Sequence, residues 1–308
     1  MNIYVIFGAP DPEAQKAREL CREYDVPFGQ ATSFLGPLEV KPARAYNADG
    51  WRDEAGELRP GVRVLLFECC GKQLMLKLLG ASSYNWLDHH RRGDRGWGKP
   101  PAQFWPASSL GQLAAELARA EILRGDACTD ADGTPLGASK WDESSGTWRV
   151  VARHYRWWTV PKHYLYAAAA DHCLAAAYRG ECPGVTPDEL MDWRVKSRAE
   201  FQGRPVEALM ADVERAREAL RQAPKIDLGG ELVADMRGQV VPELPEAAAR
   251  EGVAFLATPQ TGKRRKVVLQ CAGPAALAAW PQWALSQGLV DIYVGDPSRG
   301  FANGYIKT

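Results

Sequence analysis

The chain has 308 residues, of which 46% are hydrophobic and 25% charged. These are the proportions of an ordinary globular protein that is long enough for two domains. Lysine plus arginine and aspartate plus glutamate both number 38, so the net charge is zero. This balance excludes a global attraction to nucleic acid, to a membrane surface or to an acidic substrate, and any basic binding surface must be local.

Targeting signals and cysteine usage point to the cytoplasm. Residues 1–15 lack the basic start and the cleavage site of a signal peptide. No apolar run approaches the roughly eighteen residues that a membrane span needs, so we expect no membrane partner. The seven cysteines include no C-x-x-C pair. This pattern predicts reduced thiols in a reducing compartment rather than disulfides or structural zinc.

The first half of the chain alternates apolar, β-rich runs with amphipathic segments. Strands are predicted at Ile3–Phe7, Val62–Glu68 and Asn85–Leu87, and helices at Glu13–Tyr24, at Lys72–Leu79 and from Ser108 onward. Strands that alternate with helices predict an α/β fold with a mostly parallel sheet and helices on both faces.

The second half shows a different order of predicted elements. It is predicted to hold an alanine-rich helix, a long charged helical stretch and then a group of strands around one helix, at Tyr164–Tyr178, Pro187–Arg221, Val253–Thr258, Lys266–Cys271, Ala275–Ser286 and Val290–Val294. We therefore divide the chain into a first domain at 1–198, a helical connector at 199–226 and a smaller mixed α/β domain at 227–308.

Acidic and histidine residues follow the predicted strands. Asp11 and Glu13 come after the first strand, Glu68 ends the second, and Asp88-His89-His90 follows the third. Asp171 lies beside His172 in the alanine-rich helix. Because the carboxyl ends of parallel strands meet at one edge of a sheet, these side chains can converge. Carboxylates mixed with imidazoles suit Mn²⁺ or Mg²⁺ better than a metal that prefers thiolates.

Their order resembles that of the DHH phosphoesterase superfamily. Members carry an acidic first motif, a single acid after the second strand, an Asp-His-His triplet, a small-Ser-Ser segment and a last Asp. The matching residues here are Pro10-Asp11-Pro12-Glu13, Glu68, Asp88-His89-His90, Ala107-Ser108-Ser109 and Asp171. The resemblance covers roughly the first two-thirds of the chain, and residues 295–307 resemble, distantly, the glycine-rich end of the DHH-associated C-terminal domain.

The resemblance implies a role for each matching residue. Glu68 would bridge two ions, His89, Asp171 and Glu13 would ligate one of them, and Asp11 would belong to the other. His90 would contact the substrate phosphate, and Asp88 would orient the imidazoles. The smaller domain would bind the substrate.

Further residues are candidates for binding the substrate. The loop at 91–105 combines Arg91 and Lys99 with aromatic residues directly after the triplet, a composition that can grip phosphates and stack a base. The same residues also suit a loop that merely packs over the sheet. Ser108 and Ser109 are candidates from the family motif, although Ser108 is equally well explained as a helix N-cap. Arg299, between two glycines, is a candidate phosphate contact.

The predicted function is metal-dependent hydrolysis of a phosphoester in a nucleotide or short oligonucleotide, with Mn²⁺ or Mg²⁺ as cofactor. The partner would be a phosphorylated small molecule or a short single strand, and a homodimer is possible. The chain departs from the family in several ways. Gly8 stands where a metal-binding His is usual, Glu13 and Glu68 replace Asp, and the Gly-Gly-Gly-His motif is missing. One metal, or none, would then bind.

Two rival functions follow from these departures and from the cysteines. The first is a nucleotide- or nucleic-acid-binding protein that kept the fold and lost catalysis. The second is a thiol enzyme that uses Cys173 beside His172. It is disfavoured because adjacent residues of a helix do not face each other.

Overall fold

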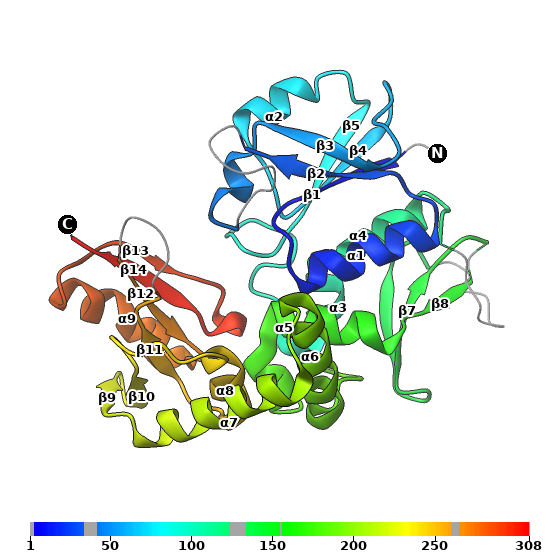
Figure 1. The fold of residues 1–308 in the computed structure, drawn as a ribbon. Helices are drawn as coiled ribbons and strands as arrows, with labels where there is room; N and C mark the ends of the chain where they lie inside the picture. The colour runs from blue at the N-terminus through cyan, green and yellow to red at the C-terminus, as the bar shows by residue number, and fades with distance from the viewer. Residues whose placement is uncertain (1–2, 34–41, 124–133, 155, 260–264, 308) are drawn as a thin grey trace. The chain divides into compact units, whose positions relative to one another are not determined.

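A computed structural model of the chain describes residues 3–33, 42–123, 134–154, 156–259 and 265–307 (Figure 1). The chain divides into two compact units. The first, the N-terminal unit, comprises Met1–His89, Gly93–Trp97 and Gln103–Asp171. The second, the C-terminal unit, comprises His90–Arg92, Gly98–Ala102 and His172–Thr308. The predicted domain limits at 198 and 226 stay a prediction.

The N-terminal unit is built on a five-stranded sheet in the order β3-β2-β1-β4-β5. The strands are β1 (Ile3–Phe7), β2 (Phe28–Thr32), β3 (Gly50–Ala55), β4 (Arg63–Phe67) and β5 (Ser83–Leu87). All neighbours pair in parallel except the edge strand β3, which is antiparallel to β2. Because parallel strands are buried on both faces, they read as apolar runs. The prediction that β1, β4 and β5 are parallel neighbours is confirmed.

Helices cover both faces of this sheet, as the alternation predicts (Figure 1). Tyr4 and Ile6 of β1 pack in one cluster with Leu74 and Leu78, which belong to α2 (Lys72–Lys77) and its C-terminal end. The 3₁₀ segment η1 (Pro42–Asn47) contributes to the same cluster.

The opposite face carries the helices that bear on the candidate site. Here α1 (Pro12–Glu23) lies beside α4 (Ser109–Arg119), which follows the short η2 (Pro101–Gln103) and α3 (Phe104–Ala107). The guanidinium of Arg18 in α1 lies 4.5 Å from the ring centroid of Phe7, which fixes α1 on this side of the sheet.

A small antiparallel sheet and a long helix complete the unit. The sheet has the order β6-β7-β8, with β6 (Ser139–Asp142), β7 (Thr147–Val151) and β8 (Trp157–Thr159). Trp148 and Trp158 are buried in it. Helix α5 (Lys162–Tyr178) begins in this unit and is interrupted at Cys173, where φ is −154° and ψ is 53°.

The C-terminal unit has a six-stranded mixed sheet in the order β13-β14-β12-β11-β10-β9. Its strands are β9 (Lys225–Leu228), β10 (Glu231–Asp235), β11 (Phe255–Ala257), β12 (Lys266–Gln270), β13 (Leu289–Val294) and β14 (Ala302–Ile306), with η3 (Pro297–Arg299) before the last. Only β10 and β11 pair in parallel. A mixed C-terminal sheet is therefore confirmed.

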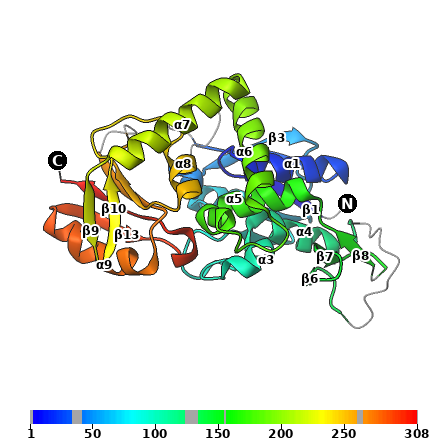
Figure 2. The same ribbon diagram turned by 90° about the horizontal axis from the view of Figure 1, so that it is seen from below.

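Four helices accompany this sheet: α6 (Pro187–Gln202), α7 (Val206–Gln222), α8 (Leu244–Glu251) and α9 (Pro274–Ser286). Helix α9 packs Leu277 and Trp280 onto one face, while α7 and α8 lie together on the other side (Figure 2). Within the described ranges, none of the helices of the protein is both long and apolar enough to cross a membrane.

Candidate metal centre

Glu68 stands at the carboxyl end of β4 in an uncommon backbone conformation. Its φ is 50°, in the left-handed region that side chains other than glycine rarely adopt. Its amide donates to the carbonyl of Leu87 at 3.0 Å, which continues the β4–β5 ladder by one residue. Such backbone strain concentrates at functional sites. The conformation turns the chain at the strand end and presents the Glu68 carboxylate beyond the sheet.

Gly8 lies directly against this turn. The amide of Gly8 donates to the carbonyl of Phe67 at 2.8 Å, and a Cβ at position 8 would collide with the carbonyl oxygen of Glu68. The position at which the family usually carries a histidine therefore has no room for any side chain in this backbone. The turn at Glu68 and the glycine at position 8 depend on each other.

Hydrogen bonds of Asp88 hold the backbone of the Asp88-His89-His90 triplet in place. The carboxylate of Asp88 accepts from the backbone N–H of His89 at 2.7 Å and from the hydroxyl of Tyr46 at 2.7 Å. The Gln112 side chain binds the backbone of Asp88 on both sides, accepting from its N–H at 3.3 Å and donating to its carbonyl at 3.0 Å. Gly96 packs so tightly on His89 that a Cβ there would meet the Cβ of His89 at 2.5 Å. These contacts fix where the imidazole of His89 leaves the backbone.

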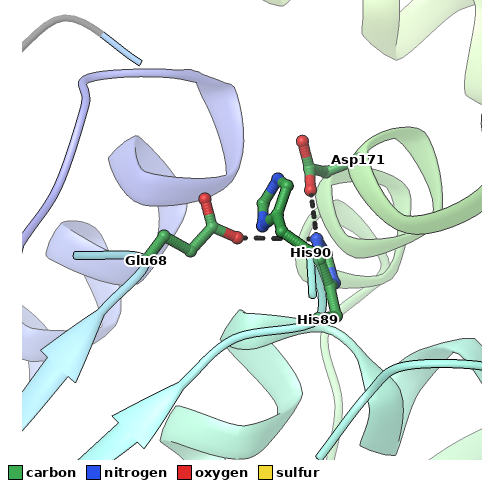
Figure 3. Close-up of side chains that lie close together, drawn as sticks. All are labelled: Glu68, His89, His90 and Asp171. Carbon is green, nitrogen blue, oxygen red and sulfur yellow. Dashed lines mark ion pairs between the residues drawn. The ribbon is translucent and has the colours of Figure 1, made fainter. Parts of the chain in front are cut away.

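Asp171, in α5, meets the imidazole of His89. Its Oδ2 lies 2.8 Å from Nε2 of His89, and Oε1 of Glu68 lies 3.6 Å from the same nitrogen (Figure 3). His90, the next residue in the chain, adds a further imidazole. Ligand atoms of Glu68, His89, His90 and Asp171 all lie within 4.8 Å of one another. A partly buried group of acids and histidines that could hold a metal ion is thus present.

The electrostatic surroundings of Glu68 favour a cation. Burial raises the pKa of the Glu68 carboxyl well above its usual value, and the carboxylates of Asp171, Asp11, Glu13 and Asp88 raise it further. A carboxylate among like charges in a low-dielectric site favours either a proton or a metal ion. The group therefore combines metal-ligand chemistry with a concentration of negative charge.

The spacing of these ligand atoms is also compatible with a shared metal ion. Ligand atoms about 2.1 Å from such an ion stand about 3.0 Å apart at adjacent octahedral positions and about 4.2 Å apart across it. The two distances from Nε2 of His89 fall near this range without rearrangement of the backbone. Oxygen and imidazole ligands without thiolate match hard or borderline metals.

The first acidic motif has other partners in this structure. Asp11 is the N-cap of α1, and its Oδ1 accepts from the amide of Ala14 at 2.7 Å. Glu13 is buried, and its Oε1 accepts from the amide of Leu110, in the first turn of α4, at 3.0 Å. Both act on the pKa of Glu68 but lie outside the group of four. Their assignment as ligands stays a prediction.

The two serines of the family motif have distinct roles. Ser108 is fully buried and caps α4: its hydroxyl accepts from the amide of Gly111 at 3.0 Å and donates to the carbonyl of Trp105 at 2.9 Å. The N-cap alternative thus accounts for Ser108. Ser109 is also buried, and its hydroxyl donates to Oε1 of Glu68 at 2.7 Å. Ser109 therefore supports the candidate metal centre.

The predicted cationic substrate contacts all belong to the C-terminal unit. Arg91 and Lys99 are exposed, and Arg299 is half-buried in η3. Lys99 lines a pocket of about 510 Å³ in this unit. Substrate binding by these three residues stays a prediction.

Tyr46 and Gln112 were not predicted, yet both hold Asp88. Tyr46 precedes the triplet by 42 residues and Gln112 follows it by 24, and neither belongs to a motif. A glutamine four residues after an N-cap serine faces the same side of the helix as the cap, and this is the one signal in the sequence that could have indicated it.

Neither a known family profile nor a curated protein matches the chain. The resemblance to the DHH superfamily consequently rests on the residues named above and on their order along the chain.

Proposed function

We propose that the chain is a metal-dependent phosphoesterase that hydrolyses a phosphoester of a nucleotide or a short oligonucleotide. The proposal is carried by one observation: ligand atoms of Glu68, His89, His90 and Asp171 lie within 4.8 Å of one another. Family resemblance supplies the reaction and the class of substrate. Mn²⁺ or Mg²⁺ is the proposed cofactor.

Each residue of such a site would have its own role. Glu68, His89 and Asp171 would hold the metal, which when bound supplies Lewis acidity toward a phosphate oxygen and lowers the pKa of water. The imidazole of His89 would bind in its neutral form. His90 would contact the substrate phosphate, and Asp88 would keep the triplet in place through the backbone of His89.

Ser109 would act as a positioning residue. Its hydroxyl donates to Oε1 of Glu68, so it restricts the rotation of that carboxylate and stabilises its charged form. Loss of such supporting contacts typically reduces metal affinity by about 10–100-fold. Ser109→Ala should weaken Mn²⁺ binding and leave the fold of the N-terminal unit intact.

The proposal is tested by metal binding and turnover measured together. Chelator-treated protein is titrated with Mn²⁺ by calorimetry, and hydrolysis of bis(p-nitrophenyl) phosphate is followed with and without the ion. Asp171→Asn should lower Mn²⁺ affinity by at least about 10-fold and reduce turnover with it. The matched control is Asp192→Asn, whose carboxylate is 67% exposed and pairs with Lys196 on the surface. Wild-type protein that neither binds Mn²⁺ nor hydrolyses the diester would refute the proposal.

Gly8 favours a second candidate, a binding protein that has lost turnover. A side chain at position 8 would collide with the Glu68 backbone, so the histidine of the family motif has no substitute there. This candidate predicts that wild-type protein binds Mn²⁺ and a fluorescent dinucleotide but releases no p-nitrophenol with Mn²⁺, Mg²⁺ or Zn²⁺. Turnover that Asp171→Asn abolishes would eliminate it.

A further inference from the structure

Two buried thiols of the C-terminal unit lie in contact. The Sγ atoms of Cys173 and Cys182 are 3.2 Å apart, and the residues are 1% and 2% exposed. Both are free thiols. A disulfide has its sulfur atoms about 2.05 Å apart, so the bond requires an approach of only about 1 Å.

The local backbone accounts for this proximity. Helix α5 departs from helical geometry at Cys173 and ends at Tyr178. Gly180 then adopts a φ of 75°, a left-handed conformation that reverses the chain and that glycine tolerates without strain. The amide of Glu181 donates back to the carbonyl of Ala176 at 3.0 Å, and this bond returns the chain toward Cys173. A short turn therefore holds Cys182 against the helix.

We propose that Cys173 and Cys182 form a redox-active dithiol, which closes to a disulfide when the protein meets a hydroperoxide. Each thiol loses one hydrogen, and the pair loses two electrons to the O–O bond of the hydroperoxide. That bond breaks to give one water and one alcohol, or two waters when the oxidant is hydrogen peroxide. A dithiol reductant reverses the reaction by thiol–disulfide exchange. This redox reaction does not require the proposed metal-dependent activity.

A pocket adjoins the segment that joins the two cysteines in the chain. The pocket of about 510 Å³ in the C-terminal unit is lined by Ala175, Arg179 and Glu181, which flank the two cysteines in the chain. Both cysteines are buried, so oxidation should need sustained exposure to the oxidant rather than a brief pulse.

The other described cysteines provide the comparison. Cys271 lines the same pocket and is partly buried, so it is open to the same oxidant. If accessibility alone governed oxidation, Cys271 would react at least as readily as the pair. If the contact between two sulfur atoms governs it, Cys173 and Cys182 should link to each other.

Peptide mapping tests the proposal directly. Full-length protein is incubated with hydrogen peroxide and a chelator, alkylated under denaturing conditions and digested with trypsin without reduction. Cleavage after Lys162, Arg179 and Arg194 places Cys173 in the peptide 163–179 and Cys182 in the peptide 180–194. The expected product is these two peptides joined, at a mass about 2 Da below their sum, and dithiothreitol treatment should separate them.

Cys182→Ser should abolish the linked product, whereas the matched control Cys271→Ser should leave its yield unchanged. Circular dichroism of each variant checks that the fold is retained. If Cys182→Ser does not fold, the peptide map of the oxidised wild-type protein still shows whether Cys173 and Cys182 are linked. The proposal is overturned if peroxide adds oxygen to Cys173 or Cys182 without linking them, or if Cys173 links preferentially to Cys271. It is also overturned if both thiols survive conditions that oxidise Cys271.

Discussion

Buried glutamates in the two units have opposite surroundings. In the C-terminal unit, Glu246 is 2% exposed and accepts from Nε and Nη2 of Arg194 at 2.9 and 2.6 Å and from the hydroxyl of Tyr178. Burial acts to raise the pKa of Glu246, but Arg194 and Tyr178 more than reverse this, and the pKa is lowered. In the N-terminal unit, Glu68 is surrounded by carboxylates and its pKa is raised.

The difference does not reflect a shortage of arginine in the N-terminal unit. Glu116, also buried, pairs with Arg63 at 2.5 Å and with Arg95 and Arg119 at 2.8 Å. Burial again acts to raise its pKa, and the three arginines lower it overall. A buried carboxylate with a structural role is thus neutralised by the chain itself. The carboxylates near Glu68 instead raise its pKa, and such a concentration of negative charge favours a proton or a metal ion.

The largest change in stability is expected from removing Arg194, whose guanidinium neutralises the buried carboxylate of Glu246. Arg194→Ala should lower the free energy of unfolding by about 3–5 kcal/mol, because it leaves the charge of Glu246 buried and unpaired. Urea denaturation followed by circular dichroism measures the change. Lys196→Ala is the control, since Lys196 and Asp192 form an exposed pair of the kind that contributes little. A loss as small as that of the control would show that Glu246 does not depend on Arg194.

The second effect concerns Glu68, whose pKa the surrounding carboxylates and burial raise. Mn²⁺ at about 100 times its dissociation constant should raise the free energy of unfolding of wild-type protein by about 2.7 kcal/mol. Glu68→Gln should remove most of this gain because it takes away a charged ligand, while metal-free stability should not fall, since one of several like charges has gone. Thermal melts with chelator and with Mn²⁺ measure the metal-free stability and the gain from the metal separately. An equal gain of stability from Mn²⁺ in wild type and in Glu68→Gln would show that Glu68 does not contribute to metal binding.

The pH dependence of stability should reveal Glu246. Its pKa is lower in the folded than in the unfolded protein, so its contribution to stability is fully present above the unfolded value of about 4.5. The contribution should decline as the pH falls below this value through the folded pKa. Each unit of difference in pKa corresponds to about 1.4 kcal/mol. Urea midpoints between pH 3 and 7 should drop less steeply in Glu246→Gln, although this variant is less stable at every pH.

The smallest change in stability is expected from removing the N-cap of α4, Ser108. Ser108→Ala should cost about 1 kcal/mol of stability, because the amide of Gly111 loses its acceptor. Mn²⁺ affinity should not change, whereas the neighbouring Ser109→Ala should weaken it through Glu68. Ser83→Ala, at an exposed strand residue, is the control for stability. A loss of Mn²⁺ affinity in Ser108→Ala comparable to that in Ser109→Ala would show that the two serines do not have separate roles.

The sequence by itself determined the parallel strands that carry the site. Strands β1 and β4 are short apolar runs because neighbouring strands and helices cover them on both faces. The triplet could be placed at the sheet edge because parallel strands end together. Strands β2 and β14 escaped prediction because FGQAT and ANGYI contain glycine and polar residues that read as turns. Their pairing comes from β1 and β12, which are distant in sequence.

Only the tertiary structure decided which buried carboxylates obtain a cation from the chain. Arg194 and Glu246 are 52 residues apart, and Arg63 and Glu116 are 53 residues apart. No local pattern relates such partners, because charge pairing depends on atoms brought within a few ångströms by the packing of separate elements. The same holds for Asp171, which meets His89 across 82 residues. The residue types of the candidate ligands could be predicted from the sequence, whereas their convergence depends on how the elements pack.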